Sequence, residues 1–238
     1  MKLRLTLEYD GTGFRGWARQ PGLRTIEGTV QGAFDGVFPR WADLVVGGRT
    51  DTGVHARGQV CSVEVEGGPP SDRVAEALNT ALPDDVAVLS AAVVPSDFHA
   101  RFSARSRSYR YVVLNRRERS ALEARRALWL PQPLDAGLLD AAAALVVGEH
   151  DFRAFTPTET QHHLFVREVF AARWERVGDH LHFTVTADSF LRHMVRTLVG
   201  TMLEHGGEGL VDLLAGRPRA EAGMTAAPWG LYLEHVEY

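Results

Sequence analysis

The chain of 238 residues contains a single cysteine, Cys61, and a single lysine, Lys2. One cysteine excludes an internal disulfide and a zinc site built from several cysteines, and it is typical of proteins from a reducing compartment. The longest apolar run, residues 141–147, is far too short to cross a bilayer, which takes about 20 residues. The alternating start MKLRLTLEYD does not resemble a signal peptide. We therefore expect a cytoplasmic protein that does not bind membranes.

Positive charge is unevenly distributed along the chain. The formal net charge is −4, which does not favour general nucleic-acid binding. Between Arg101 and Arg126, however, nine arginines face only two glutamates, a local excess of seven positive charges. The planar guanidinium fork of arginine suits phosphate groups, although a genomic bias or thermal adaptation would also enrich arginine. The cluster is therefore more informative than the net charge.

Hydrophobic periodicity divides the chain into two similar halves. With 45% hydrophobic residues the chain can bury a sizeable core. Segments in which apolar and polar residues alternate indicate strands, and stripes of apolar residues at helical spacing indicate helices. In the first half Thr25 and Ser71 can cap the two helices. The order is strand, helix, strand, strand, helix, strand, at residues 3–9, 25–37, 43–46, 59–65, 71–82 and 86–94. The second half repeats this order, with one additional short helix at 210–214: 108–114, 134–147, 165–174, 180–186, 191–202 and 230–236.

This repeated order predicts an α+β fold of two tandem ferredoxin-like halves. We place the N-terminal half at residues 1–104 and the C-terminal half at residues 105–238. The two halves are expected to share a mixed, mainly antiparallel sheet and to form a central cleft where they meet.

Three familiar kinds of site, for a dinucleotide, for a metal ion and for serine hydrolysis, are disfavoured by the motifs. Gly11–Gly16 reads G-x-G-x-x-G after a strand, but a dinucleotide site requires a helix to start there, and the helical pattern begins only at Thr25. A glycine-rich loop is the better interpretation. The motifs H-E-x-x-H and G-x-S-x-G are absent, and the pair His162-His163 has no partner at metal-ligand spacing. We expect that pair in a polar loop and predict no metal site.

Residues 47–59, GGRTDTGVHARGQ, are the first candidate for chemistry. Asp51 stands among glycines that allow close approach of a ligand to the backbone. Arg49 lies two residues earlier, so in an extended segment both side chains face the same way, and the guanidinium would keep the carboxylate ionised. That arrangement fits a nucleophile or a base. A simple Asx-type turn is the alternative.

Aromatic residues and arginines alternate in the stretch from Phe98 to Tyr111. This combination suits phosphate contacts and base stacking, which contributes roughly 1–3 kcal/mol per base. Tyr109 and Tyr111 share one face of a strand, and at least one of them is expected in the core. On the helix expected across residues 190–200, Arg192 and Arg196 lie four apart; a solvated basic face is the alternative to RNA contact there.

Several stretches together resemble the tRNA pseudouridine synthase A (TruA) family. The segment Gly48-Arg-Thr-Asp-Thr-Gly-Val-His55 is similar to the catalytic motif of that family. Further similar stretches occur in the same order across almost the whole chain: Glu8-Tyr-Asp-Gly11 with Gly16-Trp17, Leu82-Pro83, Phe98–Ser103 leading to Tyr109-Arg-Tyr111, Arg192–Gly200 and Gly230-Leu-Tyr-Leu233.

The resemblance implies a homodimeric, cofactor-free enzyme that isomerises uridine to pseudouridine in the anticodon stem-loop of tRNA, at positions 38, 39 or 40. It implies that Asp51 is catalytic and that Tyr109 stacks on the target base. Residues expected to bind substrate are Arg49, His55, Tyr109, Arg192 and Arg196. Thr52 and Ala18 depart from the family, which usually has alanine and glutamine there, so the rate or the choice of tRNA could differ.

The route of catalysis stays open at this stage, because Asp51 could attack C1′, add to the uracil ring or remove a sugar proton. A non-catalytic RNA-binding module is the alternative function, although no RNP1-type aromatic run occurs. A dinucleotide-dependent oxidoreductase built on Gly11–Gly16 is a third hypothesis.

Overall fold

The computed structural model describes residues 1–160 and 163–238, and these residues form two compact units. Unit 1 comprises residues 1–105 and 232–238, and unit 2 comprises residues 106–231. The last strand, which the periodicity assigns to the second half, thus lies in unit 1 from Tyr232 onward. His162, part of the expected polar loop, lies outside the described residues.

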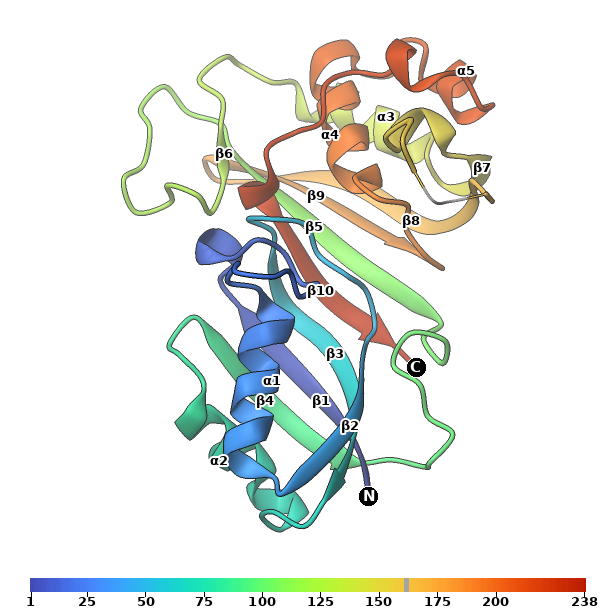
Figure 1. Ribbon diagram of the computed structural model, residues 1–238. Coiled ribbons are helices and arrows are strands. Elements are labelled where there is room, and N and C mark those ends of the chain that lie inside the picture. The colour runs from blue at the N-terminus through green and yellow to red at the C-terminus, as the bar shows by residue number, and fades with distance from the viewer. Residues whose placement is uncertain (161–162) are drawn as a thin grey trace. The chain divides into compact units, whose positions relative to one another are not determined.

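Unit 1 has the ferredoxin-like order of elements that the sequence predicts (Figure 1). Its helices and strands are β1 (Lys2–Tyr9), α1 (Ile26–Val37), β2 (Arg40–Val46), β3 (His55–Glu66), α2 (Val74–Ala81), β4 (Val86–Val93) and β10 (Leu231–Glu237). Strand β1 pairs antiparallel with β3 and β4, and β2 pairs antiparallel with β3. Strand β10 pairs parallel with β3 through Tyr232 and Leu233, opposite His55 and Ala56. The start of β3 and the C-terminal strand therefore support each other.

The core of unit 1 follows from its sequence pattern. Leu3, Leu5 and Leu7 alternate along β1 and are fully buried. Helix α1 begins after Thr25, whose side chain accepts a hydrogen bond from the Gly28 N–H, and its apolar stripe is buried against the sheet. The predicted cap at Thr25 is confirmed, and with it the late start of the helix that disfavours a dinucleotide site.

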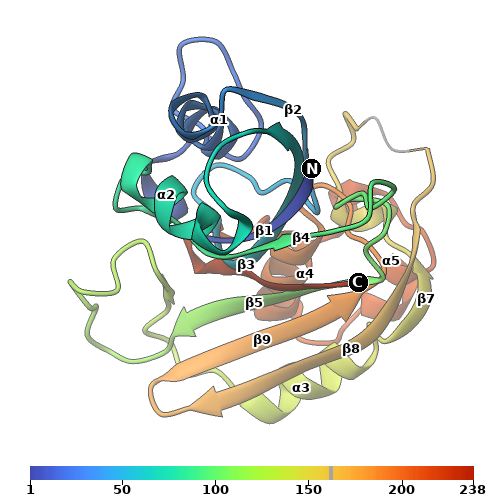
Figure 2. The ribbon, with the colours of Figure 1, turned by 90° about the horizontal axis from the view of Figure 1, so that it is seen from below.

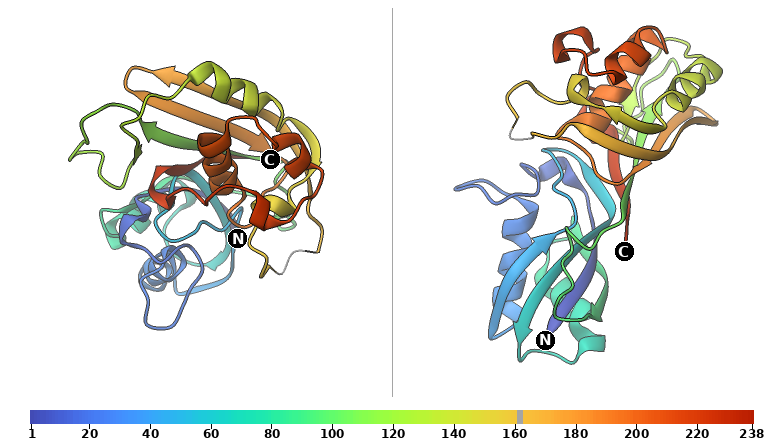
Figure 3. Two further views of the ribbon diagram at one scale, coloured as in Figure 1. Left: turned by 90° about the horizontal axis from the view of Figure 1, so that it is seen from above. Right: turned by 90° about the vertical axis from the view of Figure 1, so that its right-hand side faces the viewer.

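The strands of unit 2 form a sheet region with the antiparallel order β5-β9-β8-β7 (Figure 2). Its helices and strands are β5 (Ser106–Leu114), β6 (Leu128–Trp129), α3 (Ala136–Ala144), β7 (Gly148–Asp151), β8 (Val166–Val177), β9 (His180–Ala187), α4 (Met194–His205) and α5 (Leu210–Leu214). The short β6 pairs parallel with β5. Helices α3 and α4 cover the same face of this sheet (Figure 3). The predicted turn at residues 178–179 joins β8 to β9.

Some boundaries differ from the prediction. Ser71 does not cap α2, because residues 71–73 form a 3-10 turn and the α-helix begins only at Val74. Strand β3 begins at His55 rather than at Gln59, so the end of the glycine-rich motif is already in the sheet. The short strands β6 and β7 were not predicted. The α+β class with a mixed, mainly antiparallel sheet is confirmed, while the central cleft stays a prediction.

No helix in residues 1–160 and 163–238 is long and apolar enough to cross a membrane. Across those same residues, no group of three or more His, Cys, Asp or Glu side chains is arranged to hold a metal ion.

Candidate active site

Asp51 lies in the loop of residues 47–54, which connects β2 to β3 in unit 1. The Gly47 N–H donates to the Val60 carbonyl at 2.7 Å, where the loop leaves the sheet. The Val54 N–H donates to the Asp51 carbonyl at 3.1 Å, closing a turn in which Gly53 has a φ of 79°. Asp51 is half-buried and Arg49 is exposed. Backbone hydrogen bonds therefore hold the loop both before and after Asp51.

Two glycines of the stretch 11–16 pack directly against this loop. A Cβ added to Gly11 would lie 2.0 Å from the Val54 carbonyl oxygen. Gly16 has a φ of 86°, and a Cβ there would lie 3.0 Å from the Thr50 carbonyl oxygen and 3.3 Å from the Asp51 carbonyl carbon. Glycine is thus required for close backbone packing at these two positions. The stretch that resembles a dinucleotide fingerprint serves as the support of the Asp51 loop.

A buried hydrogen-bond network holds Thr50, the residue before Asp51. Its hydroxyl lies 2.8 Å from the Tyr9 hydroxyl, and its carbonyl accepts from the Trp17 N–H at 2.9 Å. The side-chain amide of Gln59 donates to the Tyr9 hydroxyl at 3.2 Å and to the Gly48 carbonyl at 2.7 Å. Burial raises the pKa of the Tyr9 phenol to about 12, so it stays protonated at neutral pH.

The network continues into the first turn of α1. The Ile26 N–H donates to the Gly16 carbonyl at 3.1 Å, and the Glu27 N–H donates to the Trp17 carbonyl at 3.0 Å. These amides have no partner within the helix, so the loop supplies their acceptors. A chain of contacts therefore runs from the helix through Trp17 to the Asp51 loop.

His55, at the end of the loop, is 3% exposed. Its Nδ1 accepts from the Gly11 N–H at 3.1 Å and lies 3.2 Å from the Asp10 carboxylate. The ring also stacks on Tyr232, with centroids 4.7 Å apart. The structure gives His55 a supporting position, and its expected contact with substrate stays a prediction.

The aromatic stretch at residues 98–103 forms a tight turn, also in unit 1. His99 Nδ1 accepts from the N–H groups of Arg101 and Phe102, at 3.2 Å each. The Ala100 carbonyl accepts from the Tyr238 hydroxyl at 2.7 Å. Phe102 is 77% exposed, and its ring stacks on His99. This turn is therefore rigid while it presents an aromatic ring to solvent.

In unit 2, Tyr109 and Tyr111 lie on β5 with different surroundings. Tyr111 is fully buried, donates to the Ala227 carbonyl at 2.7 Å and has a pKa raised by burial. It is a core residue, as expected for one of the two. Tyr109 is 9% exposed and meets the Phe190 ring edge-on, with centroids 5.0 Å apart. Phe190 therefore restricts the orientation of the Tyr109 ring.

The prediction of one helix face carrying Arg192 and Arg196 is wrong. His193 has a φ of 63°, and α4 begins only at Met194, so Arg192 precedes the helix. Arg192 is exposed, whereas the Arg196 guanidinium donates to the Ala226 carbonyl at 2.8 Å. The two arginines thus have different environments, and their contact with substrate stays a prediction.

Several residues that support the Asp51 loop were not predicted as site residues. The spacing of Gly11 and Gly16 marks them as unusual in the sequence. Tyr9 and Gln59 are not marked in this way, because each belongs to an ordinary strand pattern. Arg107 is also unexpected: it is 9% exposed, and its guanidinium donates to the Asp188 carbonyl at 2.8 Å. Nothing in the arginine cluster distinguishes it before folding.

Comparison with known proteins identifies relatives along the whole chain. A family described as tRNA pseudouridine synthase matches residues 6–103 and 142–238. Proteins named tRNA pseudouridine synthase A are 42% identical in Moorella thermoacetica, 36% in Caldicellulosiruptor bescii and 38% in Bartonella bacilliformis. The alignments cover 99%, 98% and 100% of this chain and 99%, 98% and 99% of those relatives, respectively.

Proposed function

This chain belongs to the tRNA pseudouridine synthase A family, and from this premise we propose that Asp51 is its catalytic residue. Members of the family are isomerases that form pseudouridine in tRNA, so a non-catalytic RNA-binding module is no longer needed as an explanation. We further propose that the targets are uridines of the anticodon stem-loop, at positions 38, 39 or 40.

The reaction exchanges one bond to the sugar for another within the same nucleotide. The N1–C1′ bond breaks, the uracil turns, and C5 bonds to C1′ while the C5 proton is lost and N1 gains a proton. Attack at C1′, addition to the ring and removal of a sugar proton each require an ionised carboxylate next to the nucleotide. The target base must leave its stack, which costs a few kcal/mol. No net oxidation or reduction occurs, so we propose a cofactor-free reaction.

The observation that supports Asp51 most strongly is the construction of its loop. Thr50 is bonded through both its carbonyl and its hydroxyl, and Gly48 through its carbonyl. A reactive group must be held near its productive geometry before the substrate arrives, because small displacements are costly. A surface turn without a chemical role does not need a buried support of this kind.

Five further residues are proposed for the remaining expected roles. We propose that Tyr109 stacks on the displaced base and that Arg49, His55, Arg192 and Arg196 help to bind RNA. Replacing Tyr109 by Phe keeps the ring, so activity should be retained; a strong loss would instead indicate proton transfer through the hydroxyl. We also propose a homodimer in the cytoplasm.

The test is pseudouridine formation on an unmodified tRNA transcript by wild type and Asp51→Asn. We expect the variant to lose turnover and to keep tRNA binding, because the amide has nearly the same shape without the charge. Asp97→Asn, the same exchange at an exposed aspartate, is the matched control and should retain turnover. Equal turnover by wild type and Asp51→Asn would remove Asp51 from the mechanism.

A further inference from the structure

The segment between β5 and β6 carries an unusual concentration of arginine. Residues 115–127, named the arm here, include five arginines and two glutamates. Four of the arginines are exposed: Arg117, Arg119, Arg125 and Arg126. Leu122 is 89% exposed beside them. A cluster of exposed positive charge on a chain of net charge −4 requires an explanation.

The arm is anchored where it leaves and rejoins the sheet. The Asn115 side-chain amide donates to the carbonyls of Leu130 and Gln132, at 2.9 Å and 2.7 Å. Its side-chain oxygen accepts from Arg176 on β8 at 2.9 Å. The Asn115 N–H donates to the Asp179 carbonyl at 2.8 Å. One residue therefore ties together both ends of the arm and the β8–β9 hairpin.

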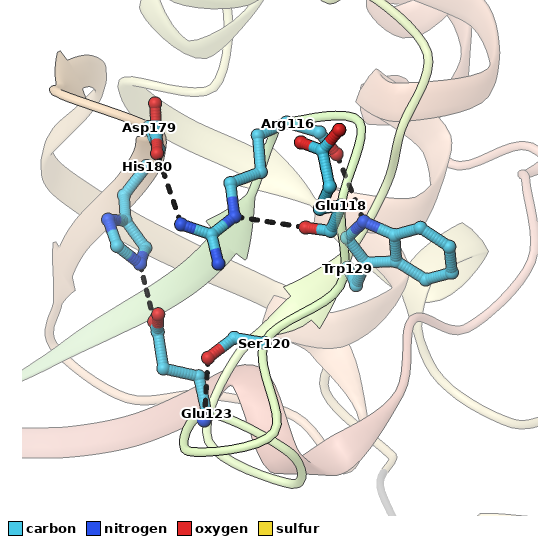
Figure 4. Close-up of polar contacts among 7 residues, drawn as sticks. All are labelled: Arg116, Glu118, Ser120, Glu123, Trp129, Asp179 and His180. Atoms are coloured by element: carbon cyan, nitrogen blue, oxygen red, sulfur yellow. Dashed lines mark hydrogen bonds and ion pairs between the residues drawn. The ribbon is translucent and has the colours of Figure 1, made fainter.

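Contacts within the arm and with the residues next to it hold the path of its backbone (Figure 4). The Arg116 guanidinium donates to the Glu118 carbonyl at 2.9 Å and lies 3.3 Å from the Asp179 carboxylate. The Trp129 indole donates to the Arg116 carbonyl at 3.0 Å. The Arg116 side chain thus stabilises the conformation of the arm. The exposed arginines belong to the backbone segment that these contacts hold in place.

A second attachment lies near the far end of the arm (Figure 4). The Glu123 carboxylate lies 2.5 Å from His180 Nε2, at the start of β9. The Glu123 N–H donates to the Ser120 hydroxyl at 3.2 Å, and its carbonyl accepts from the Arg126 N–H at 2.9 Å. One of the two acidic side chains is therefore directed to the sheet, which leaves the exposed charge of the arm predominantly positive.

We propose that the arm is a phosphate-binding surface that contacts the sugar–phosphate backbone of the tRNA, away from the nucleotide that reacts. This inference rests on the proposed function for the identity of the RNA. Arginine forks match the paired oxygens of phosphate groups, and an ordered segment loses less conformational entropy on binding than a free loop. Backbone contacts of this type contribute affinity and orientation without reading sequence.

The experiment compares tRNA binding by wild type and two double variants, Arg117→Ala with Arg119→Ala and Arg125→Ala with Arg126→Ala. Fluorescence anisotropy with an unmodified tRNA transcript at several salt concentrations gives the affinity and its salt dependence. Each lost phosphate contact should lower the slope of log K against log salt by roughly 0.7–0.9, and each double variant should bind about 5- to 30-fold more weakly at low salt. Turnover at saturating tRNA should not change.

Two controls separate charge in the arm from charge elsewhere. The variant Arg117→Lys with Arg119→Lys keeps the charges and should keep the slope. Arg173→Ala removes an exposed arginine from β8, where it pairs with Glu175, and should leave affinity nearly unchanged. Thermal melting of every variant checks that the fold is intact.

Failure of this inference and failure of the proposed function give different results. Wild-type affinity and slope in both double variants would overturn the arm as a binding surface, even if pseudouridine is formed. Absence of pseudouridine in the wild-type reaction would overturn the proposed function, whatever the arm contributes to RNA affinity.

Discussion

The hydroxyl of Tyr9 lies 2.8 Å from the hydroxyl of Thr50, the residue directly before Asp51. This contact links the end of β1 to the Asp51 loop through two buried side chains. Because the Gln59 amide also donates to the Tyr9 hydroxyl, one phenol joins three segments of unit 1. The position of Asp51 therefore depends on a buried side chain of a neighbouring strand.

Replacing Tyr9 by Phe should reduce turnover more than tRNA affinity. The change leaves Thr50 and Gln59 with one partner fewer in a buried site, which costs about 1–3 kcal/mol of stability. A small shift of the loop should then lower kcat by about 10- to 100-fold, with KM nearly unchanged. Single-turnover kinetics measures this. Tyr111→Phe removes a comparable buried hydroxyl from unit 2 and should preserve kcat; equal losses in both variants would contradict a positioning role for Tyr9.

Replacing Gly11 by Ala should displace the Asp51 loop. The new Cβ would lie 2.0 Å from the Val54 carbonyl oxygen, and such overpacking costs typically about 1–3 kcal/mol. Activity should fall together with the melting temperature. Gly32→Ala, in helix α1 with nothing within 4 Å of the added Cβ, should stabilise the protein by about 0.5–1 kcal/mol. If Gly11→Ala matched wild type in activity and melting temperature, close packing of these two loops would not be required.

Stability should decline at alkaline pH because of Cys61. Burial raises the pKa of its thiol from 9.0 to about 12. Above about pH 9 the unfolded chain loses this proton while the folded chain retains it, so the stabilisation present below pH 9 is lost progressively up to about pH 12. Each pH unit in this window removes up to about 1.4 kcal/mol from the free energy of unfolding.

Urea denaturation of wild type and Cys61→Ala at several pH values measures that decline. The variant is less stable at neutral pH, but its free energy of unfolding should fall less steeply above about pH 9. Tyr9, whose pKa is also raised to about 12, contributes to both proteins above its ordinary value of about 10. Parallel curves for the two proteins would show that Cys61 ionisation does not control the alkaline response.

Glu123 and Glu118 offer a test of whether the shape of the arm matters beyond its charge. Replacing either by Ala removes one negative charge from the arm, and simple electrostatics then predicts tighter tRNA binding for both. Only Glu123 contacts His180. We expect Glu118→Ala to bind slightly more tightly and Glu123→Ala to bind more weakly, by about 2- to 5-fold, because a loosened arm must be ordered on binding. Tighter binding by both variants would show that the charge of the arm, and not its conformation, determines its effect on tRNA affinity.

The periodic segments of this chain were predictable because burial follows sequence directly there. Leu3, Leu5 and Leu7 alternate into the core, and Thr25 caps its helix as expected. Arg192 was predicted to lie on the helix because the left-handed backbone at His193, which delays the start of α4 to Met194, leaves no mark on hydrophobic spacing.

The candidate site was predictable only in part. Asp51 was identifiable because its glycine-rich motif is continuous in sequence. Its support was not, because Tyr9, Trp17 and Gln59 reach the loop from separate elements, and hydrogen bonds between distant segments have no local pattern.

The division of the chain into units has a consequence for its synthesis. Residues 232–238 belong to the unit that residues 1–105 begin, and Tyr232 stacks on His55, directly after the Asp51 loop. A ribosome produces the chain from its N-terminus, so residues 1–105 emerge before the strand that completes their unit has been made. A polypeptide that stopped before residue 231 would therefore carry Asp51 without the strand that supports its surroundings.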